Sequence, residues 1–169
     1  GDFGFSQYGA NYSITRKTSK RNISFGKTSY DGDYKYTDST GNKIKRLNNY
    51  LDQFFLSVDR QFVVREDFLV NIFTLRTENV RGAAGSTTFP SDNATRKDDF
   101  ELFALSFNKF FDNGSLDLYM NRSNNYQEFD DSEGSFPVYS EHELDYSVFG
   151  LKGNHTINSS FNYEAAFNV

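Results

Sequence analysis

Residues 103–120 read FALSFNKFFDNGSLDLYM and contain the clearest fold signal in the chain. The segment Asp112-Asn113-Gly114-Ser115 holds the Asn-Gly dipeptide of two-residue β-hairpin turns, and alternating apolar residues flank it. We expect Asn113 and Gly114 to form the turn, so that Phe111 pairs with Leu116 and Asn108 with Tyr119. This register predicts two unlike faces. The apolar face holds Phe103, Leu105, Phe107, Phe111, Leu116, Leu118 and Met120, and the polar face holds Ser106, Asn108, Asp112, Ser115, Asp117, Tyr119 and Asn121.

Lys109 and Arg122 are exceptions on the apolar face of this hairpin. Long basic side chains can lie along an apolar surface and reach water at its border, which is how we interpret both residues. They therefore do not contradict the predicted register.

The same two-residue alternation recurs along the chain and predicts eight antiparallel strands. The six further segments lie near residues 8–15, 23–26, 54–59, 68–77, 144–148 and 160–169. In segment 68–77 apolar residues occupy both faces, so its orientation stays open between Phe68, Val70 and Ile72 on one side and Leu69, Phe73 and Leu75 on the other.

The connections between these strands alternate in length. Short reversals at 16–21, 64–67, 112–115 and 152–159 take turns with long polar segments at 31–42, 78–98 and 129–141. Short turns at one rim and long loops at the other are typical of outer-membrane β-barrels. Aromatic residues near the short turns, Phe62, Phe110 and Phe111, match the ring girdle of such barrels. We therefore predict an all-β fold of antiparallel up-and-down transmembrane β-barrel strands, with a soluble sandwich as the alternative.

The composition excludes several classes of protein. Aromatic residues reach 18% while all hydrophobic residues total 37%, and the mean hydropathy is -0.68. No run approaches the roughly 20 apolar residues of a membrane-spanning helix, and Gly1-Asp2-Phe3-Gly4 does not open a signal peptide. The 18 Lys and Arg against 23 Asp and Glu give a net charge of -5, which argues against a nucleic-acid partner. The absence of Cys excludes a disulfide framework.

An ordered series of motifs resembles TonB-dependent outer-membrane receptors, especially the vitamin B12 (cobalamin) receptor branch. The series is an opening Gly-x-x-Gly strand, a Tyr-Asp-Gly-Asp loop, Asn49-Tyr50-Leu51, the run from Arg81 to Ser91, the hairpin at 111–118 and the strand entry at 140–145. The resemblance runs nearly end to end. It implies that residues 1–169 are a partial β-barrel domain, about the second to ninth strands of a 22-stranded barrel, without the plug domain. We expect a fragment, because the chain stops within a strand at Asn168-Val169.

The resemblance also implies a function for the intact receptor in the bacterial outer membrane. Such receptors bind a scarce nutrient, cobalamin or a ferric siderophore, at extracellular loops and pass it by a plug that TonB moves. The implied partners are outer-membrane lipid, the plug domain, TonB and the nutrient. The resemblance further implies Ca²⁺ at acidic residues of an early loop, here Asp31, Asp33 and Asp38, and oxygen-rich loops suit that ion.

Aromatic residues in and beside the long loops are the candidate ligand contacts, since exposed rings pack on flat ligands. They are Tyr30, Tyr34, Tyr36, Phe89, Tyr126, Phe129, Phe136 and Tyr139. Each could equally pin one loop against another, and the acidic residues could equally be solvated. The histidines, His142 and His155, fall at opposite predicted rims, and no catalytic motif is visible, so we expect no enzyme.

Two alternatives remain open at this point. One is a small autonomous eight-stranded outer-membrane barrel that acts as an adhesin or anchor. The other is a soluble lipocalin-like carrier, in which Phe107, Leu118, Phe161 and Phe167 would pack in a dry centre.

Overall fold

The fold is all-β, as predicted. The computed structural model describes residues 4–37, 40–85, 91–134, 136–158 and 161–169. Its ten strands are β1 (Ser6–Arg16), β2 (Ser19–Tyr30), β3 (Tyr34–Thr37), β4 (Lys43–Arg46), β5 (Leu51–Arg65), β6 (Phe68–Gly82), β7 (Thr95–Phe111), β8 (Gly114–Asp131), β9 (Val138–Asn158) and β10 (Phe161–Asn168). Among these residues no helix has the length and apolar character to cross a membrane.

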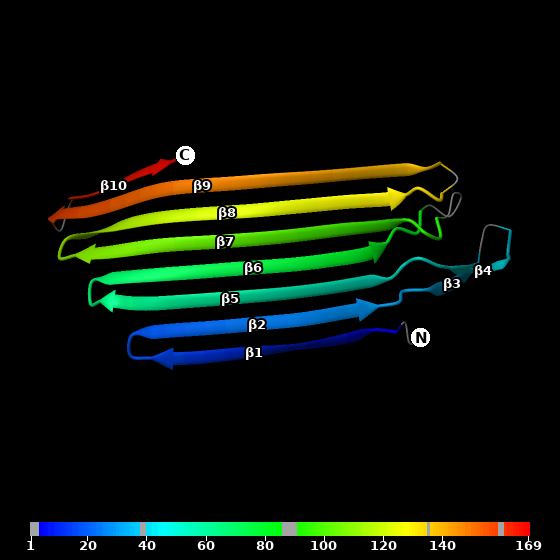
Figure 1. Cartoon of the computed structure of the whole chain (residues 1–169), viewed down its shortest axis with the longest axis horizontal. Coiled ribbons are helices and arrows are strands. Elements are labelled where there is room, and N and C mark those ends of the chain that lie inside the picture. Colours follow the sequence, from blue (N-terminus) through cyan, green and yellow to red (C-terminus); the bar gives the residue numbers. More distant parts are fainter. Residues whose placement is uncertain (1–3, 38–39, 86–90, 135, 159–160) are drawn as a thin grey trace.

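Eight strands form one antiparallel sheet in the order β1-β2-β5-β6-β7-β8-β9-β10 (Figure 1). Successive strands of the sheet are neighbours, so the chain runs up and down and confirms the predicted eight-strand meander. We call the end with the β1–β2, β5–β6, β7–β8 and β9–β10 connections the short-turn end, and the other the long-loop end. There β3 and β4 form a separate hairpin that the sequence analysis missed, since it treated residues 31–42 as a loop.

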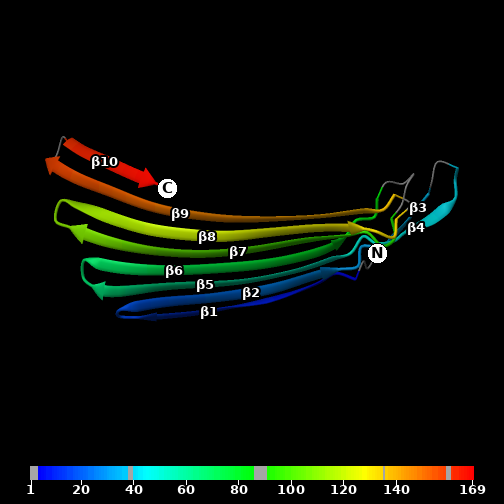
Figure 2. The ribbon, with the colours of Figure 1, turned by 45° about the horizontal axis from the view of Figure 1, so that its top comes forward.

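The sheet is one layer, curved, with no second layer against either face (Figure 2). In the part of the chain that the structure describes, the buried apolar side chains are Ala84 and Ala94, and both lie between β6 and β7. Leu118 is 48% exposed and Phe167 is 66% exposed. These two residues therefore do not meet in the dry centre of a sandwich or carrier; the side chain of Phe161 lies outside the described ones.

The β7–β8 turn differs from its prediction by one position. Asp112 and Asn113 form it, Phe111 pairs with Gly114, and Asn108 pairs with Asp117. Gly114 does not have a positive φ; a Cβ there would collide with the backbone oxygen of Asn154 in β9. Close strand packing, rather than turn geometry, therefore requires this glycine. The pairing differs from the expected one by two residues, so every side chain stays on its predicted face.

The strands are longer and the loops shorter than the alternation indicated. The loop after β6 covers 83–94 rather than 78–98, and the loop after β8 covers 132–137 rather than 129–141. Residues 152–158, expected in a turn, belong to β9. Strand segments with polar residues on both faces give no two-residue hydropathy signal, which is why these ends were missed.

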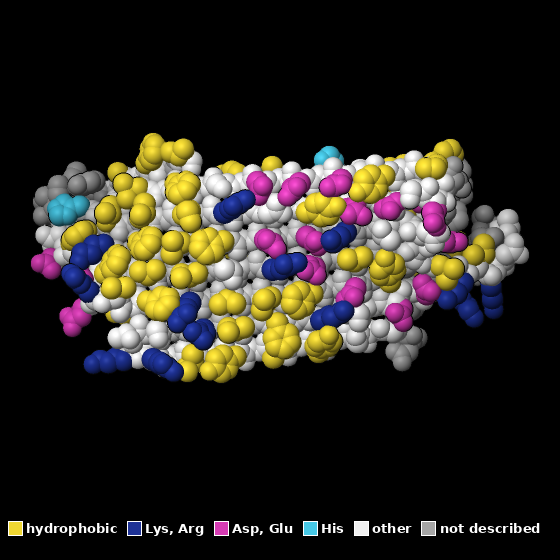
Figure 3. Space-filling view, viewed as in Figure 1, with side chains coloured by type: hydrophobic (Ala, Val, Ile, Leu, Met, Phe, Trp, Pro, Cys, Tyr) yellow, Lys and Arg dark blue, Asp and Glu magenta, His cyan; other side chains and the backbone are white. Residues whose placement is uncertain are grey.

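One face, which we call the banded face, has two zones. Near the short-turn end lies an apolar band, and nearer the long loops lies a charged zone (Figure 3). The band includes Ile14, Ile23, Val58, Phe62, Phe68, Val70, Ile72, Phe103, Leu105, Phe107, Leu116, Leu118, Met120, Phe149 and Leu151. The charged zone includes Arg76, Glu78, Lys97, Asp99, Glu101, Arg122, Glu128, Glu141, Glu143 and Asp145. The register thus settles the open orientation of β6 in favour of Phe68 on the apolar side.

Directly behind the band, the opposite or polar face carries a ladder of side-chain hydrogen bonds. The Gln61 amide donates to Asn71 Oδ1 at 3.0 Å, and the Asn71 amide donates to Asn108 Oδ1 at 2.8 Å. The Asn108 amide in turn donates to Asp117 Oδ1 at 2.9 Å. The ladder joins β5, β6, β7 and β8, so the two faces of the same strand segments suit opposite surroundings.

Rings on the polar face lie flat where the neighbouring strand has glycine. Tyr119 pairs with Gly150, and a Cβ on Gly150 would overlap the tyrosine ring. Phe55 covers Gly26 in the same way. An aromatic side chain over a cross-strand glycine shields its backbone and fixes the register.

The short turns are staggered across the sheet. Arg16, the last residue of β1, lies in one cross-strand row with Phe62, Phe107 and Leu151. These three lie three, four and seven residues before the ends of β5, β7 and β9. A progressive stagger of this kind is what strands tilted around a barrel require.

Two details near the short turns revise the sequence interpretation. Phe110 pairs with Ser115 on the polar face, so it does not join Phe62 and Phe111 in a girdle on the banded face. Two consecutive aromatic residues in a strand necessarily point to opposite faces. Lys109 donates a hydrogen bond to Asp67 in the β5–β6 turn, and this bond lowers the pKa of the Asp67 carboxyl.

Candidate functional site

The candidate site is a hollow on the polar face at the long-loop end. One cross-strand row there contains Tyr30, Leu51, Arg81, Arg96, Phe129 and Ser140. Tyr30, Arg81, Arg96 and Phe129 line a hollow of about 560 Å³ together with Asn49, Tyr50, Leu51, Gly82 and Ala83. Two cations and three rings therefore border one space.

Arg81 and Arg96 are directly opposite each other on β6 and β7. Like charges in such positions repel, and one carboxylate offsets the repulsion. Asp98 accepts hydrogen bonds from Arg96 Nε at 3.1 Å and from Arg96 Nη2 at 3.0 Å, and it lies 3.8 Å from Arg81 Nη2. One carboxylate between two guanidinium groups leaves a positive charge in excess, and both arginine side chains stay more than 40% exposed.

Loop contacts hold the wall of this hollow in place. Asn48, which has a φ of 59°, donates to the carbonyl oxygen of Ala94 at 2.6 Å and to that of Ser91 at 3.3 Å. The Ser91 hydroxyl donates to Asp131 Oδ1 at 2.7 Å. We call these four residues the loop clasp. It ties the segment before β5 and the β6–β7 loop to the end of β8, and it contains the buried residue Ala94, whose exposure is 1%.

This arrangement can bind an anion beside a flat group. Arginine makes paired hydrogen bonds to carboxylate or phosphate, and Tyr30, Tyr50 and Phe129 supply ring faces. The hollow therefore offers donors and apolar walls.

Of the aromatic residues predicted to contact a ligand, the structure brings Tyr30 and Phe129 together in the hollow. Tyr126 and Tyr139 lie on the banded face, where their hydroxyls donate to Glu128 at 2.6 Å and Glu141 at 3.0 Å.

The remaining predicted aromatic residues lie elsewhere. Tyr34 and Tyr36 lie together in β3, with ring centroids 6.1 Å apart. Phe136, in the β8–β9 loop, is 70% exposed, and Phe89 lies outside the described residues. The rings thus form several groups rather than one.

The acidic residues proposed for calcium are only partly described. Asp33 forms an ion pair with Lys45 at 3.0 Å, and Asp38 lies outside the described residues. Among those that are described, no group of three or more His, Asp or Glu is arranged to hold a metal. The nearby Asn49 amide donates to the Gly32 carbonyl at 3.0 Å and thereby braces the loop. Calcium at this loop stays a prediction.

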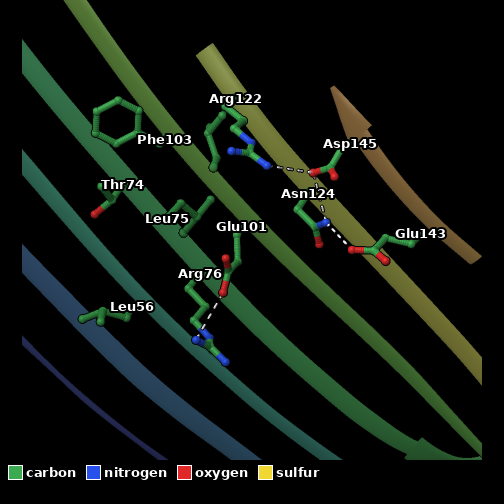
Figure 4. Close-up of a pocket in the computed structure, with 11 residues that line it drawn as sticks. Leu56, Thr74, Leu75, Arg76, Glu101, Phe103, Arg122, Asn124, Glu143 and Asp145 are labelled. Atoms are coloured by element: carbon green, nitrogen blue, oxygen red, sulfur yellow. Dashed lines mark hydrogen bonds and ion pairs between the residues drawn. The ribbon is translucent and has the colours of Figure 1, made fainter. Parts of the chain in front are cut away.

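A second hollow, of about 570 Å³, lies on the banded face at the border between its two zones (Figure 4). Phe103 and Leu56 form its apolar side. On its charged side Arg76 pairs with Glu101 at 3.2 Å, and the Asn124 amide donates to Glu143 at 2.8 Å. Its charges pair among themselves, so we interpret it as the border of the band.

Sequence reasoning missed Arg81 and Arg96 because it placed both in a loop. The signal that could have found them is their symmetric placement, since each is the second strand residue from the loop at 83–94 and the two therefore lie opposite each other. His142 and His155 do lie near opposite ends of β9, as predicted, since His142 pairs with Gln127 and His155 with Gly114.

Comparison with known proteins adds no assignment. No family model matches the chain, and no curated protein or solved structure matches it significantly. A function for this chain therefore has to be argued from its own residues and their geometry.

Proposed function

We propose that this chain forms consecutive membrane-crossing strands of a TonB-dependent outer-membrane receptor that imports a scarce nutrient, cobalamin or a ferric siderophore. The observation that carries the proposal is the contrast between the apolar band and the amide ladder directly behind it. A single sheet with these two faces suits lipid on one side and an enclosed aqueous or protein-filled space on the other.

The dimensions of the band support a membrane. On β7 the apolar positions of this face span nine residues, from Phe103 to Phe111 with Lys109 as the exception, and a tilted transmembrane strand needs about 9–11 residues. Its side chains remain uncovered, with Phe149 53% and Phe111 56% exposed. Contiguous apolar surface of this extent is rare on soluble monomers, so it indicates contact with lipid.

The sheet edges favour a larger barrel over the two alternatives. In the described sheet β1 and β10 lie at opposite edges and do not pair with each other. A closed eight-stranded barrel would require that pairing. A soluble carrier would enclose the aromatic rows, whereas the band here is exposed and the opposite face of the same strands carries amides. Further strands, paired to β1 and β10, would satisfy both edges and enclose room for a plug domain.

In this orientation the long-loop end is extracellular and the hollow with Arg81 and Arg96 faces the barrel interior. A nutrient that carries a phosphate or carboxylate beside a flat ring system matches its donors and ring faces. Cobalamin and many ferric siderophores have such groups. The plug and TonB then act on the ligand held there, as in the receptors that the sequence resembles.

Single-cysteine labelling tests the proposal, since these 169 residues contain no native Cys and any Cys encoded elsewhere in the complete gene is first replaced by Ser. In the protein expressed from its complete gene in outer membranes, Leu118→Cys should resist a membrane-impermeant maleimide until the membrane is dissolved. Asn124→Cys, on the same strand and face but in the charged zone, should react on intact cells. Equal reaction rates at both positions would show that the band is in water and would overturn the proposal.

A further inference from the structure

Three arginines gather on the banded face at the short-turn end of β1, β2 and β5. Arg21 pairs with Arg60 across the strands, and Arg16 lies near them beside the β1–β2 turn. All three line a small hollow of about 150 Å³ together with Tyr12, Ile14, Ser19 and a fourth cation, Lys20. Dark-blue side chains mark this region at the lower left of Figure 3. We call it the arginine hollow.

These arginines differ from most other cations of the sheet, although Lys20 and Arg65 also form no ion pair among the described residues. Within the described ranges, none of the three forms an ion pair. Ion pairs are formed by Lys27, Arg76, Arg81, Arg96, Lys97, Lys109, Arg122 and Lys152. The Arg60 guanidinium instead lies 4.5 Å above the Phe62 ring, and its neighbour Asp59 points to the opposite face.

The surroundings make this clustering costly unless an anion is present. Arg21 and Arg60 share a cross-strand row with Ile14 and Ile72, and Phe62 and Val70 follow in the next row. Directly opposed like charges repel, and apolar neighbours reduce the screening by water. An anion between the guanidinium groups would turn this repulsion into attraction, and phosphate fits arginine in two-point hydrogen bonds.

We propose that Arg16, Arg21 and Arg60 bind the phosphate of an anionic phospholipid headgroup. The inference rests on the proposed membrane location, which places the short-turn end of the banded face at the periplasmic leaflet. The headgroup would occupy the arginine hollow, and the acyl chains would lie along the apolar band from Ile14 and Ile23 toward the long-loop end. Clustered basic side chains at this depth are the usual means of recognising anionic lipids.

The test measures lipid retention by the complete protein. Purified protein is exchanged into nanodiscs of phosphatidylglycerol and phosphatidylcholine in equal amounts, and the lipids that co-migrate after mild detergent extraction are counted by native mass spectrometry. We expect the native protein to retain phosphatidylglycerol about tenfold over phosphatidylcholine. The variant R16Q/R21Q/R60Q should lose this preference. R60Q alone serves where the triple variant does not fold.

The matched control K17Q/K35Q/K43Q removes the same charge from positions outside the arginine hollow, and it should keep the preference. Equal loss in both variants would reveal unspecific attraction and overturn the site. Displacement of the lipid by millimolar inorganic phosphate would assign the site to free phosphate and overturn the lipid assignment. If the native protein shows no preference for phosphatidylglycerol while Leu118→Cys stays protected, only the lipid site is overturned. A freely reactive Leu118→Cys overturns the proposed function, and the lipid site with it.

Discussion

The substitution Leu118→Arg separates lipid from water as the surroundings of the band. Leu118 lies between Phe107 and Leu151 in its cross-strand row and is 48% exposed. At an exposed position in water, such a change alters the unfolding free energy by less than about 0.5 kcal/mol. In the middle of a membrane, an outward arginine costs about 2–4 kcal/mol, which is roughly 30- to 900-fold in the folding equilibrium.

The assay is urea unfolding of the complete protein folded into phospholipid vesicles. Circular dichroism follows the transition, since it reports directly on the β-sheet. Asn124→Arg is the control, because position 124 is on the same strand and face but lies beside Glu143 and Asp145, and its stability should change little. A loss below about 0.5 kcal/mol for Leu118→Arg would refute a lipid-facing band.

Three further outcomes follow from the polar face. Asn71→Leu removes the middle of the amide ladder and leaves its neighbours short of partners, so it should lower the unfolding free energy by about 1–3 kcal/mol in the same assay, whereas a neutral result would mean that water replaces the ladder. Gly150→Leu should displace the Tyr119 ring and cost at least about 1 kcal/mol, as overpacking does, and an unchanged unfolding midpoint would contradict the flat ring. Replacing Arg81 and Arg96 by Gln should weaken nutrient binding about tenfold or more without changing the amount of receptor in the membrane; unaltered binding by isothermal titration would exclude the hollow as the ligand site.

The assignment of residues to faces could be predicted from the sequence, and the reason is parity. The Asn113-Gly114 signal placed the β7–β8 turn one residue too late, yet the resulting two-residue difference in pairing returned Phe107, Leu118 and Asn108 to their expected faces. The strand ends could not be predicted in the same way. Between the band and the long-loop end, the banded face carries charges and the polar face carries amides, so hydropathy no longer alternates there.

The candidate site depended on information that a local pattern does not contain. Arg81 and Arg96 are separated by the β6–β7 loop and meet only because the two strands have matching ends. The aromatic residues Tyr30 and Phe129 were identified by type alone, whereas Tyr126, of the same type, points to the other face. Which ring lines the hollow follows from register, and register over long strands requires the pairing of the whole sheet.

The distribution of charge along the banded face agrees with the proposed change in surroundings from water to lipid. In the charged zone, Arg76, Lys97 and Arg122 each have an acidic partner at the surface, where water makes such pairs inexpensive to form and to break. In the band, the same strands carry Phe and Leu in place of these pairs, as the proposed contact with lipid would require, because separated charges in lipid are costly. Arg21 and Arg60 are exceptions to this distribution, since they lie beside isoleucines of the band and have no acidic partner in the described part of the chain. The sheet pairs its charges in the charged zone and has few charges in the band. We therefore expect unpaired cations such as these only where an anion from outside the chain neutralises them.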